Sequence, residues 1–252
     1  MIMEKDRQFD TGQIKIGFKK SHSVINRLIL DAELLLKNGR YSSSVALAIL
    51  AFEELSKADL LRVKIIRNEK LSLKEWEKMV KGRESHQIKL SYLIEKKEKK
   101  VEQKWSDFDI QFLNAANKKL GFISYGDRNS VRNDIQVLKK ILPKLNLVKQ
   151  DCFYLNWNFK QKKWLNFDNR FSDKIKKAIA TYLILETKQI LLLQKFTFEL
   201  KDRLLVQLTE EDWLKLKNSK VCKQIIIIQK EIQKRTIKGE IPLAITALSN
   251  YD

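Results

Sequence analysis

Two short groups of charged residues have the types and spacing that phosphate chemistry needs. The first group, Glu53, Glu54 and Lys57, follows directly after an apolar run over 45–52. A charged side chain is costly to bury unless it is paired. The i,i+4 spacing of Glu53 and Lys57 allows one ion pair on a helix, which is the alternative without a functional role. That pair leaves Glu54 without a partner, which indicates a carboxylate kept for function.

The second group is Arg83, His86 and Lys89, which are spaced three residues apart. On a helix this spacing places all three along one side. Arginine can bind a phosphate through two parallel hydrogen bonds, and lysine supplies a point charge. Histidine, with an ordinary pKa of about 6.5, can exchange a proton. The group therefore predicts a phosphate site, and the alternative is a basic helix face with an incidental histidine.

The two groups become one site if their helices are neighbours in a bundle. Glu54 would then orient or neutralise His86 and Lys89 across a groove. We expect no metal and no cofactor, because Cys152, Cys222 and the two histidines have no paired ligand spacing.

The composition predicts a partner that carries negative charge. Lys and Arg number 50 against 31 Asp and Glu, a formal net charge of +19. This surplus suits RNA, DNA or the ribosome, although a general lysine bias of the genome is an alternative. The first residues are charged, and no apolar run approaches the ~20 residues of a membrane span. We expect a cytoplasmic protein without membrane contact.

Scarce Pro and Gly together with abundant helix formers predict an all-α antiparallel bundle. Predicted helices span 21–38, 42–67, 73–80, 83–103, 130–142 and 173–201, with two or three more in the last fifty residues. Gly39 and Pro143 end two of them, and Ser42 or Ser43 caps the second. Ser72 and Glu75 have the spacing of a capping box.

Two segments are not predicted to be helical. Residues 121–129 are predicted to form an exposed loop. Aromatic residues without helical period over 152–167 predict an extended segment or a hairpin.

Three segments resemble the AbiV family of abortive-infection proteins. The first comprises 31–35, 39–41 and 48–57, ending in Glu-Glu-Leu-Ser-Lys, and the second is Ser-His-Gln-Ile-Lys-Leu at 85–90. The third, 149–155, is similar to a short extended stretch of that family. Together they cover roughly residues 20–200. The corresponding domain prediction is an N-terminal tail over 1–19, a family domain over 20–200 and a helical extension over 201–252.

This resemblance implies a HEPN-like fold, a role in abortive infection, a phage-encoded protein as trigger and a homodimer. Many HEPN proteins are metal-independent ribonucleases that use an Arg and a His separated by four to six residues. Here only two residues separate Arg83 from His86. The family's own Glu-Glu-x-x-Lys and His-x-x-Lys patterns are both present.

The leading hypothesis is a ribonuclease toxin that stops translation. His86 would act as general acid or base on 2′-hydroxyl attack, and the cations would stabilise the phosphorane. The predicted catalytic residues are His86, Arg83, Lys89, Glu54 and Lys57, and the predicted RNA contacts are Arg83, Lys89 and Glu53. The alternative is a non-catalytic protein that blocks RNA or the ribosome together with a phage product. Aromatic residues over 153–167 can stack on bases in that case, or they can simply pack against the helical bundle as an apolar contact. A third reading, partner of a nucleotidyl transferase, stays open, since the Gly-Ser and paired-Asp motif of the transferase itself is absent.

Overall fold

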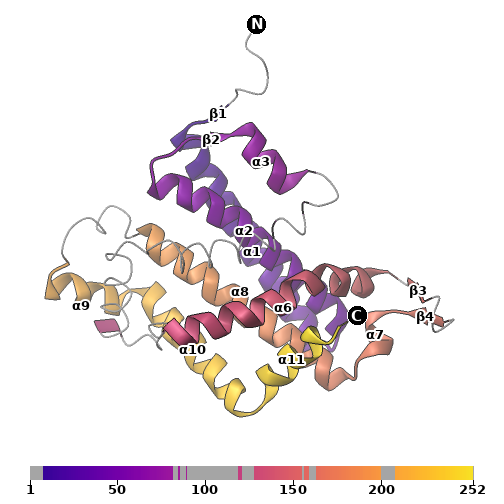
Figure 1. Cartoon of the computed structure of the whole chain (residues 1–252). Helices are drawn as coiled ribbons and strands as arrows, with labels where there is room; N and C mark the ends of the chain where they lie inside the picture. Colours follow the sequence, from indigo (N-terminus) through magenta and orange to yellow (C-terminus); the bar gives the residue numbers. More distant parts are fainter. Residues whose placement is uncertain are drawn as a thin grey trace, which may run out of the picture.

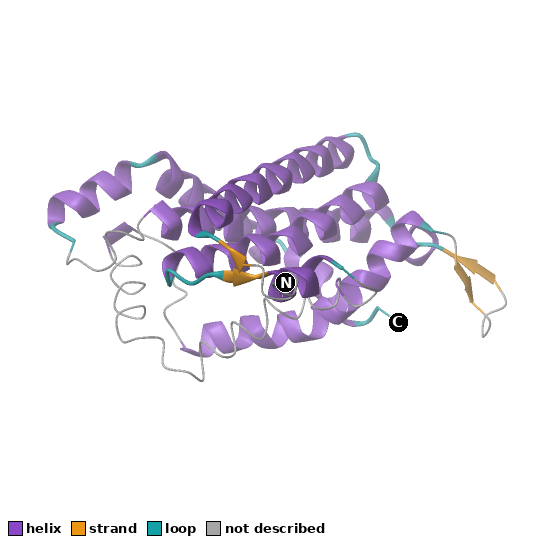
Figure 2. Ribbon diagram, turned by 90° about the horizontal axis from the view of Figure 1, so that it is seen from above, coloured by secondary structure: helices purple, strands orange, loops and turns teal. Residues whose placement is uncertain are grey.

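The chain folds into an all-α bundle, as predicted, and the computed structural model describes residues 8–81, 85, 89, 119–120, 128–154, 156–158, 163–199 and 208–251. Its described helices are α1 (Thr11–Lys37), α2 (Tyr41–Ile66), α3 (Leu73–Val80), α6 (Arg128–Phe153), α7 (Phe167–Arg170), α8 (Asp173–Glu199), α9 (Glu210–Asn218), α10 (Lys220–Ile237) and α11 (Glu240–Ser249). The strands β1 (Gln8–Phe9) and β2 (Leu71–Ser72) pair antiparallel, as do β3 (Asn156–Asn158) and β4 (Lys163–Leu165). The β3–β4 hairpin projects from one end of the helical body (Figures 1 and 2).

Helix α2 is the buried centre of the bundle, in contact with α1, α6 and α8. Most residues of its apolar run are fully buried, including Ala46, Ala48 and Ala51. Alanine at these positions lets the neighbouring backbones approach closely. The prediction of a central helix is therefore confirmed, and any charge on its buried faces requires a partner from another helix.

Helix α1 begins ten residues earlier than predicted. Asp10 accepts a hydrogen bond from the Gln13 backbone N–H at 2.8 Å, and the Gln13 side chain accepts one from the Asp10 N–H at 3.0 Å. This capping box places 11–19, which we assigned to an N-terminal tail, inside the helix. Gly39 ends α1 as predicted, in the left-handed conformation with φ of 72°.

The second helix begins at Tyr41 without a side-chain cap, so the prediction that Ser42 or Ser43 caps it is wrong. The Ser42 hydroxyl donates instead to Asp168, and the Ser44 hydroxyl donates to the Ala32 carbonyl at 2.7 Å. These serines hold α2 to other elements rather than closing its first turn. The predicted end near residue 67 and the Ser72–Glu75 capping box of α3 are confirmed.

Helix α6 runs through Pro143, which we predicted to end it. The pyrrolidine ring faces solvent, while Ile141, Leu142 and Leu145 on either side are buried in the core. Burial of these side chains offsets the missing backbone donor, so the helix continues to Phe153. The stretch 149–153 is consequently helical and not extended. The predicted hairpin is confirmed only for β3 and β4, where Trp157 lies opposite Trp164.

The described part of the last fifty residues contains three helices, where we predicted two or three, and α11 contributes Ile241, Ala244 and Leu248 to the main core. Helix α8 begins directly after Ser172, as predicted. Of the helix predicted over 83–103, only Ser85 and Lys89 are described, and both are helical. The loop predicted over 121–129 lies outside the described residues up to 127. Among the described helices, none combines the length and apolar character needed to cross a membrane.

Candidate functional site

Glu53 is the most deeply buried carboxylate on α2, with 1% of its surface exposed. Its Oε1 atom lies 2.5 Å from Nζ of Lys149, which α6 contributes from 96 residues further along the chain. Glu53 is therefore paired with a lysine from another helix and not with Lys57, the partner that i,i+4 spacing allowed. A buried carboxylate is stabilised best by a cation that is itself removed from water, and α6 brings that cation to this face of α2.

Glu54 pairs with Lys57, with 2.5 Å between the carboxylate and ammonium groups. The two residues are separated by one helical turn at i,i+3, and about a fifth of each side chain is exposed. The alternative in which Glu53 takes Lys57 and leaves Glu54 without a partner therefore does not hold. Both carboxylates that follow the apolar run are consequently paired with lysines from different directions.

Lys89 lies against α2 beside these pairs. Its backbone carbonyl accepts a hydrogen bond from the Ser56 hydroxyl, which is fully buried. The Lys89 side chain is 7% exposed, and Ser85, one turn earlier, is 5% exposed. Lys89 therefore packs on α2, near the two carboxylates that follow the apolar run.

Burial lowers the pKa of Lys89 below its ordinary value, and repulsion from Lys57 and Lys149 lowers it further. Attraction by Glu53 and Glu54 opposes part of this shift. The charges of Glu53, Glu54, Lys57 and Lys149 thus act on Lys89, and we call these five residues the lysine–carboxylate cluster. Three ammonium groups face two carboxylates, so the cluster carries one excess positive charge when all are ionised.

Lys89 is the ammonium group of the cluster that forms no ion pair within the described part of the chain. A buried, unpaired cation is unfavourable in the free protein. A bound anion, such as a phosphodiester, would supply the missing counter-charge. An anion such as a phosphate therefore suits the charge of the cluster, and the lowered pKa of Lys89 favours its neutral amine, which can accept a proton.

The structure brings together Glu53, Glu54, Lys57 and Lys89 of the predicted site. Arg83 and His86 lie outside the described residues, so their roles and the predicted approach of Glu54 to His86 remain predictions. Sequence reasoning missed Lys149, because we read Pro143 as the end of a helix. A continued helical period from Leu145 would have placed Lys149 on the buried face.

The other histidine, His22, lies on α1 with its ring centroid 4.1 Å from that of Phe18. Burial lowers its pKa from 6.5 to about 4, and the charges of Lys195 and Arg62 act in the same direction. His22 is therefore neutral at physiological pH. It packs as an aromatic side chain and is poorly suited to proton transfer there.

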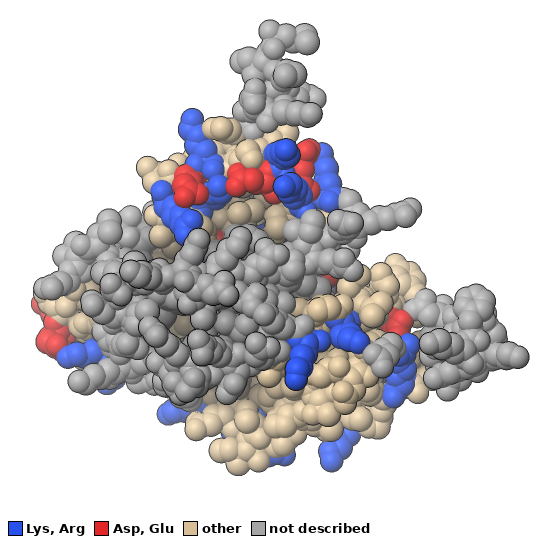
Figure 3. All heavy atoms as spheres, viewed as in Figure 1, with Lys and Arg blue, Asp and Glu red and all other residues tan. Residues whose placement is uncertain are grey.

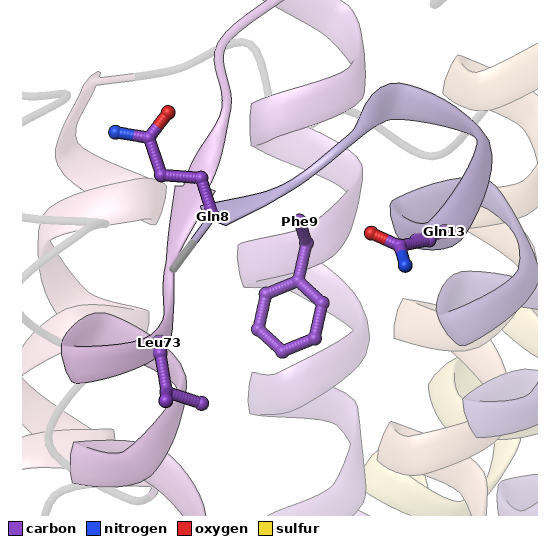
Figure 4. Close-up of a pocket in the computed structure, with 4 residues that line it drawn as sticks. All are labelled: Gln8, Phe9, Gln13 and Leu73. Atoms are coloured by element: carbon purple, nitrogen blue, oxygen red, sulfur yellow. The ribbon is translucent and has the colours of Figure 1, made fainter. Parts of the chain in front are cut away.

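A hollow of about 420 Å³ lies where β1 and β2 meet the start of α1 (Figure 4). Its lining residues are Gln8, Phe9, Gln13 and Leu73. The Gln8 amide points away from the Phe9 ring (Figure 4). None of these side chains titrates, and Gln13 already serves the cap of α1. This hollow offers no group for acid–base chemistry, in contrast to the lysine–carboxylate cluster.

Comparison with known proteins gives one match, to the family model described as AbiV, over residues 13–191. The matched region is more than two thirds of the chain and holds α1, α2, α3, α6 and the cluster residues. No curated protein and no solved structure matches this sequence. The match agrees with the all-α fold and with the motifs around Glu53 and Lys89, and the chain therefore belongs to the AbiV family of HEPN-like abortive-infection proteins.

Proposed function

We propose that this protein is the ribonuclease toxin of an abortive-infection system and cleaves RNA at the lysine–carboxylate cluster. The observation that carries the proposal is Lys89, a buried lysine that forms no ion pair among the described residues and that is acted on by the charges of two carboxylates and two further lysines. A phosphodiester is the kind of anion that such a site binds and polarises.

The reaction that suits these groups is attack of the RNA 2′-hydroxyl on the adjacent phosphorus. A base takes the 2′ proton, the P–O5′ bond breaks, and an acid gives a proton to the departing 5′ oxygen. The products are a 2′,3′-cyclic phosphate and a 5′-hydroxyl. Ammonium groups of Lys57, Lys89 and Lys149 would stabilise the extra negative charge on the phosphorane.

Protons would be transferred by His86, as the sequence predicts, or by Lys89 itself. The lowered pKa of Lys89 increases the fraction of neutral amine that can accept a proton. Glu53 and Glu54 would hold the neighbouring ammonium groups in place through their 2.5 Å contacts. Activation by a phage-encoded protein and action as a homodimer are further parts of the proposal, and both rest on the family resemblance.

A second candidate function is a non-catalytic block of translation through binding to RNA or to the ribosome. It is favoured by the net charge of +19 and by the projecting β3–β4 hairpin, whose register sets Trp157 opposite Trp164. In this case the lysine–carboxylate cluster would bind phosphate without turnover.

Substitution of Lys89 by Met tests the proposal, because methionine fills a similar volume without charge. We expect Lys89→Met to abolish RNA cleavage and phage protection while the melting temperature stays equal or rises. The rise would follow from removing a buried cation that has no ion pair among the described residues. Lys140→Met, an exposed lysine on α6, is the matched control and should retain both activities.

The two candidate functions separate in the same set of measurements. Cleavage by the wild type that is lost in Lys89→Met supports the ribonuclease. Full cleavage by a stably folded Lys89→Met protein contradicts the proposed site. A wild type that protects cells and binds RNA, but cleaves none in the presence of phage lysate, supports the non-catalytic function.

A further inference from the structure

Helix α10 carries a row of lysines on the side that faces away from the core. The lysine row comprises Lys220, Lys223, Lys230, Lys234 and, at the C-cap, Lys238, and all five are exposed. At about 100° per residue these positions fall within an arc of about 80°. At about 1.5 Å per residue the row is about 27 Å long.

The opposite side of α10 is fixed in the protein interior. Its buried residues are Val221, Cys222, Ile225 and Gln229. The first three of these residues pack with Phe196 of α8 and with Leu120 in a second apolar cluster. The buried apolar side of this helix is consequently not available for insertion into a lipid surface. The exposed side carries the lysine row together with Ile227 and Ile237.

No carboxylate neutralises the lysine row within the described part of the chain. The two acidic residues near the row, Glu231 and Glu240, both pair with Arg235, at 2.6 and 2.5 Å. Five ammonium groups in a line repel each other in the free protein. Such an arrangement attracts a partner whose negative charges are also spaced along a line.

We propose that the lysine row binds the phosphate backbone of a nucleic acid strand. The row extends along most of α10, and no carboxylate of the described residues pairs with it, which matches a chain of phosphates better than a single anion. It lies beyond residues 13–191 that match the family model, and its case does not depend on the proposed cleavage. In the view of Figure 3, basic side chains along the lower edge, where α10 and α11 lie in Figure 1, have no acidic neighbours in sight.

The test is a salt titration of binding to labelled oligouridine and oligothymidine by the full-length protein. The variant replaces all five lysines of the row by Gln, and its control replaces five other exposed lysines, Lys15, Lys19, Lys20, Lys74 and Lys78. Each phosphate contact with a single strand contributes about 0.7 to the slope of log affinity against log salt. Loss of five contacts should therefore lower that slope by about 3 to 4, whereas the control should lower it by less than about 1.

Equal slopes for the wild type and the row variant would overturn the proposal, as would an equal loss in the control. Loss of phage protection with an unchanged slope would assign the row to an acidic protein, which also overturns it. Cleavage at saturating RNA is a separate readout: the row variant should retain it and Lys89→Met should lose it. Failure of the lysine row and failure of the cleavage site are thus distinguishable.

Discussion

Glu53 and Lys149 form the most buried ion pair among the described residues, with side chains 2% and 8% exposed. Removing one member of such a pair leaves the other charge buried without its partner. We predict that Glu53→Gln lowers the free energy of unfolding by about 3 kcal/mol. Urea denaturation of the wild type and the variant measures this difference.

The control for Glu53 is Glu77→Gln, since the Glu77–Lys81 pair is largely exposed and should cost less than about 1 kcal/mol. The double variant Glu53→Gln with Lys149→Met should recover most of the loss, because neither member of this pair is then left buried without the other. A Glu53→Gln protein as stable as the Glu77→Gln control would show that the pair is not a structural contact.

His22 gives a pH dependence whose sign follows from its lowered pKa. Between about 4 and 6.5, the unfolded chain binds a proton at His22 and the folded protein does not. Stability should therefore decrease as the pH falls through this range. Between pH 7 and 4.5 the wild type should lose on the order of 2 kcal/mol more than His22→Gln. Urea denaturation at the two pH values checks this, and identical losses would mean that His22 titrates normally.

At the residue scale, the sequence predicted which side chains gather but not how they pair. Apolar residues before Glu53 showed that carboxylates enter the core, and the segment at 85–90 pointed to Lys89. Spacing within one helix is the only pairing information that a sequence carries directly. The partner of Glu53 comes from α6, so the pair with Lys149 had to be found in three dimensions.

At the element scale, the end of α1 is set by Gly39. The Arg40 N–H donates to the Leu35 carbonyl at 2.9 Å, and the Gly39 N–H donates to the Leu36 carbonyl at 3.3 Å. This pattern requires a left-handed residue, and glycine adopts that conformation without strain. It turns the chain so that α2 packs back along α1, which places Glu53 and Glu54 in the bundle.

We predict that Gly39→Ala lowers the free energy of unfolding by about 1 to 2 kcal/mol. An added Cβ meets nothing within 4 Å, so the cost is backbone strain alone. Gly39→Asn should cost less, since asparagine tolerates the left-handed region. Thermal melts of the two variants provide the comparison. Equal stability of Gly39→Ala and the wild type would contradict a strained position.

Some helix boundaries could be predicted from residues close to the helix end, and others could not. Gly39 and the Ser72–Glu75 capping box predicted the end of α1 and the start of α3 correctly, because the hydrogen bonds at these positions join residues that are close in sequence. At Pro143 the local signal was outweighed by tertiary burial of Ile141, Leu142 and Leu145, which no single-helix argument includes. The start of α1 was in the sequence, since Asp10 and Gln13 have capping-box spacing, but we began the helix only where the apolar period is clear.

At the scale of the whole molecule, the C-terminal helices and the family-matched region share one core. Ile241, Ala244 and Leu248 of α11 pack in it, and the Tyr251 hydroxyl donates to Asp151 of α6 at 2.5 Å. The Arg170 guanidinium lies 4.7 Å from the centre of the Tyr251 ring. The helix that supplies Lys149 is thus held from both sides, by α2 and by the end of the chain.

The most direct test of the central claim is the chemistry of the RNA ends that the purified protein produces with phage lysate and EDTA. Attack by the 2′-hydroxyl at the lysine–carboxylate cluster predicts fragments with a 2′,3′-cyclic phosphate and a 5′-hydroxyl. Those fragments should be absent with Lys89→Met and present with Lys140→Met. Intact RNA with the wild type, or fragments from Lys89→Met at the wild-type rate, would contradict the account.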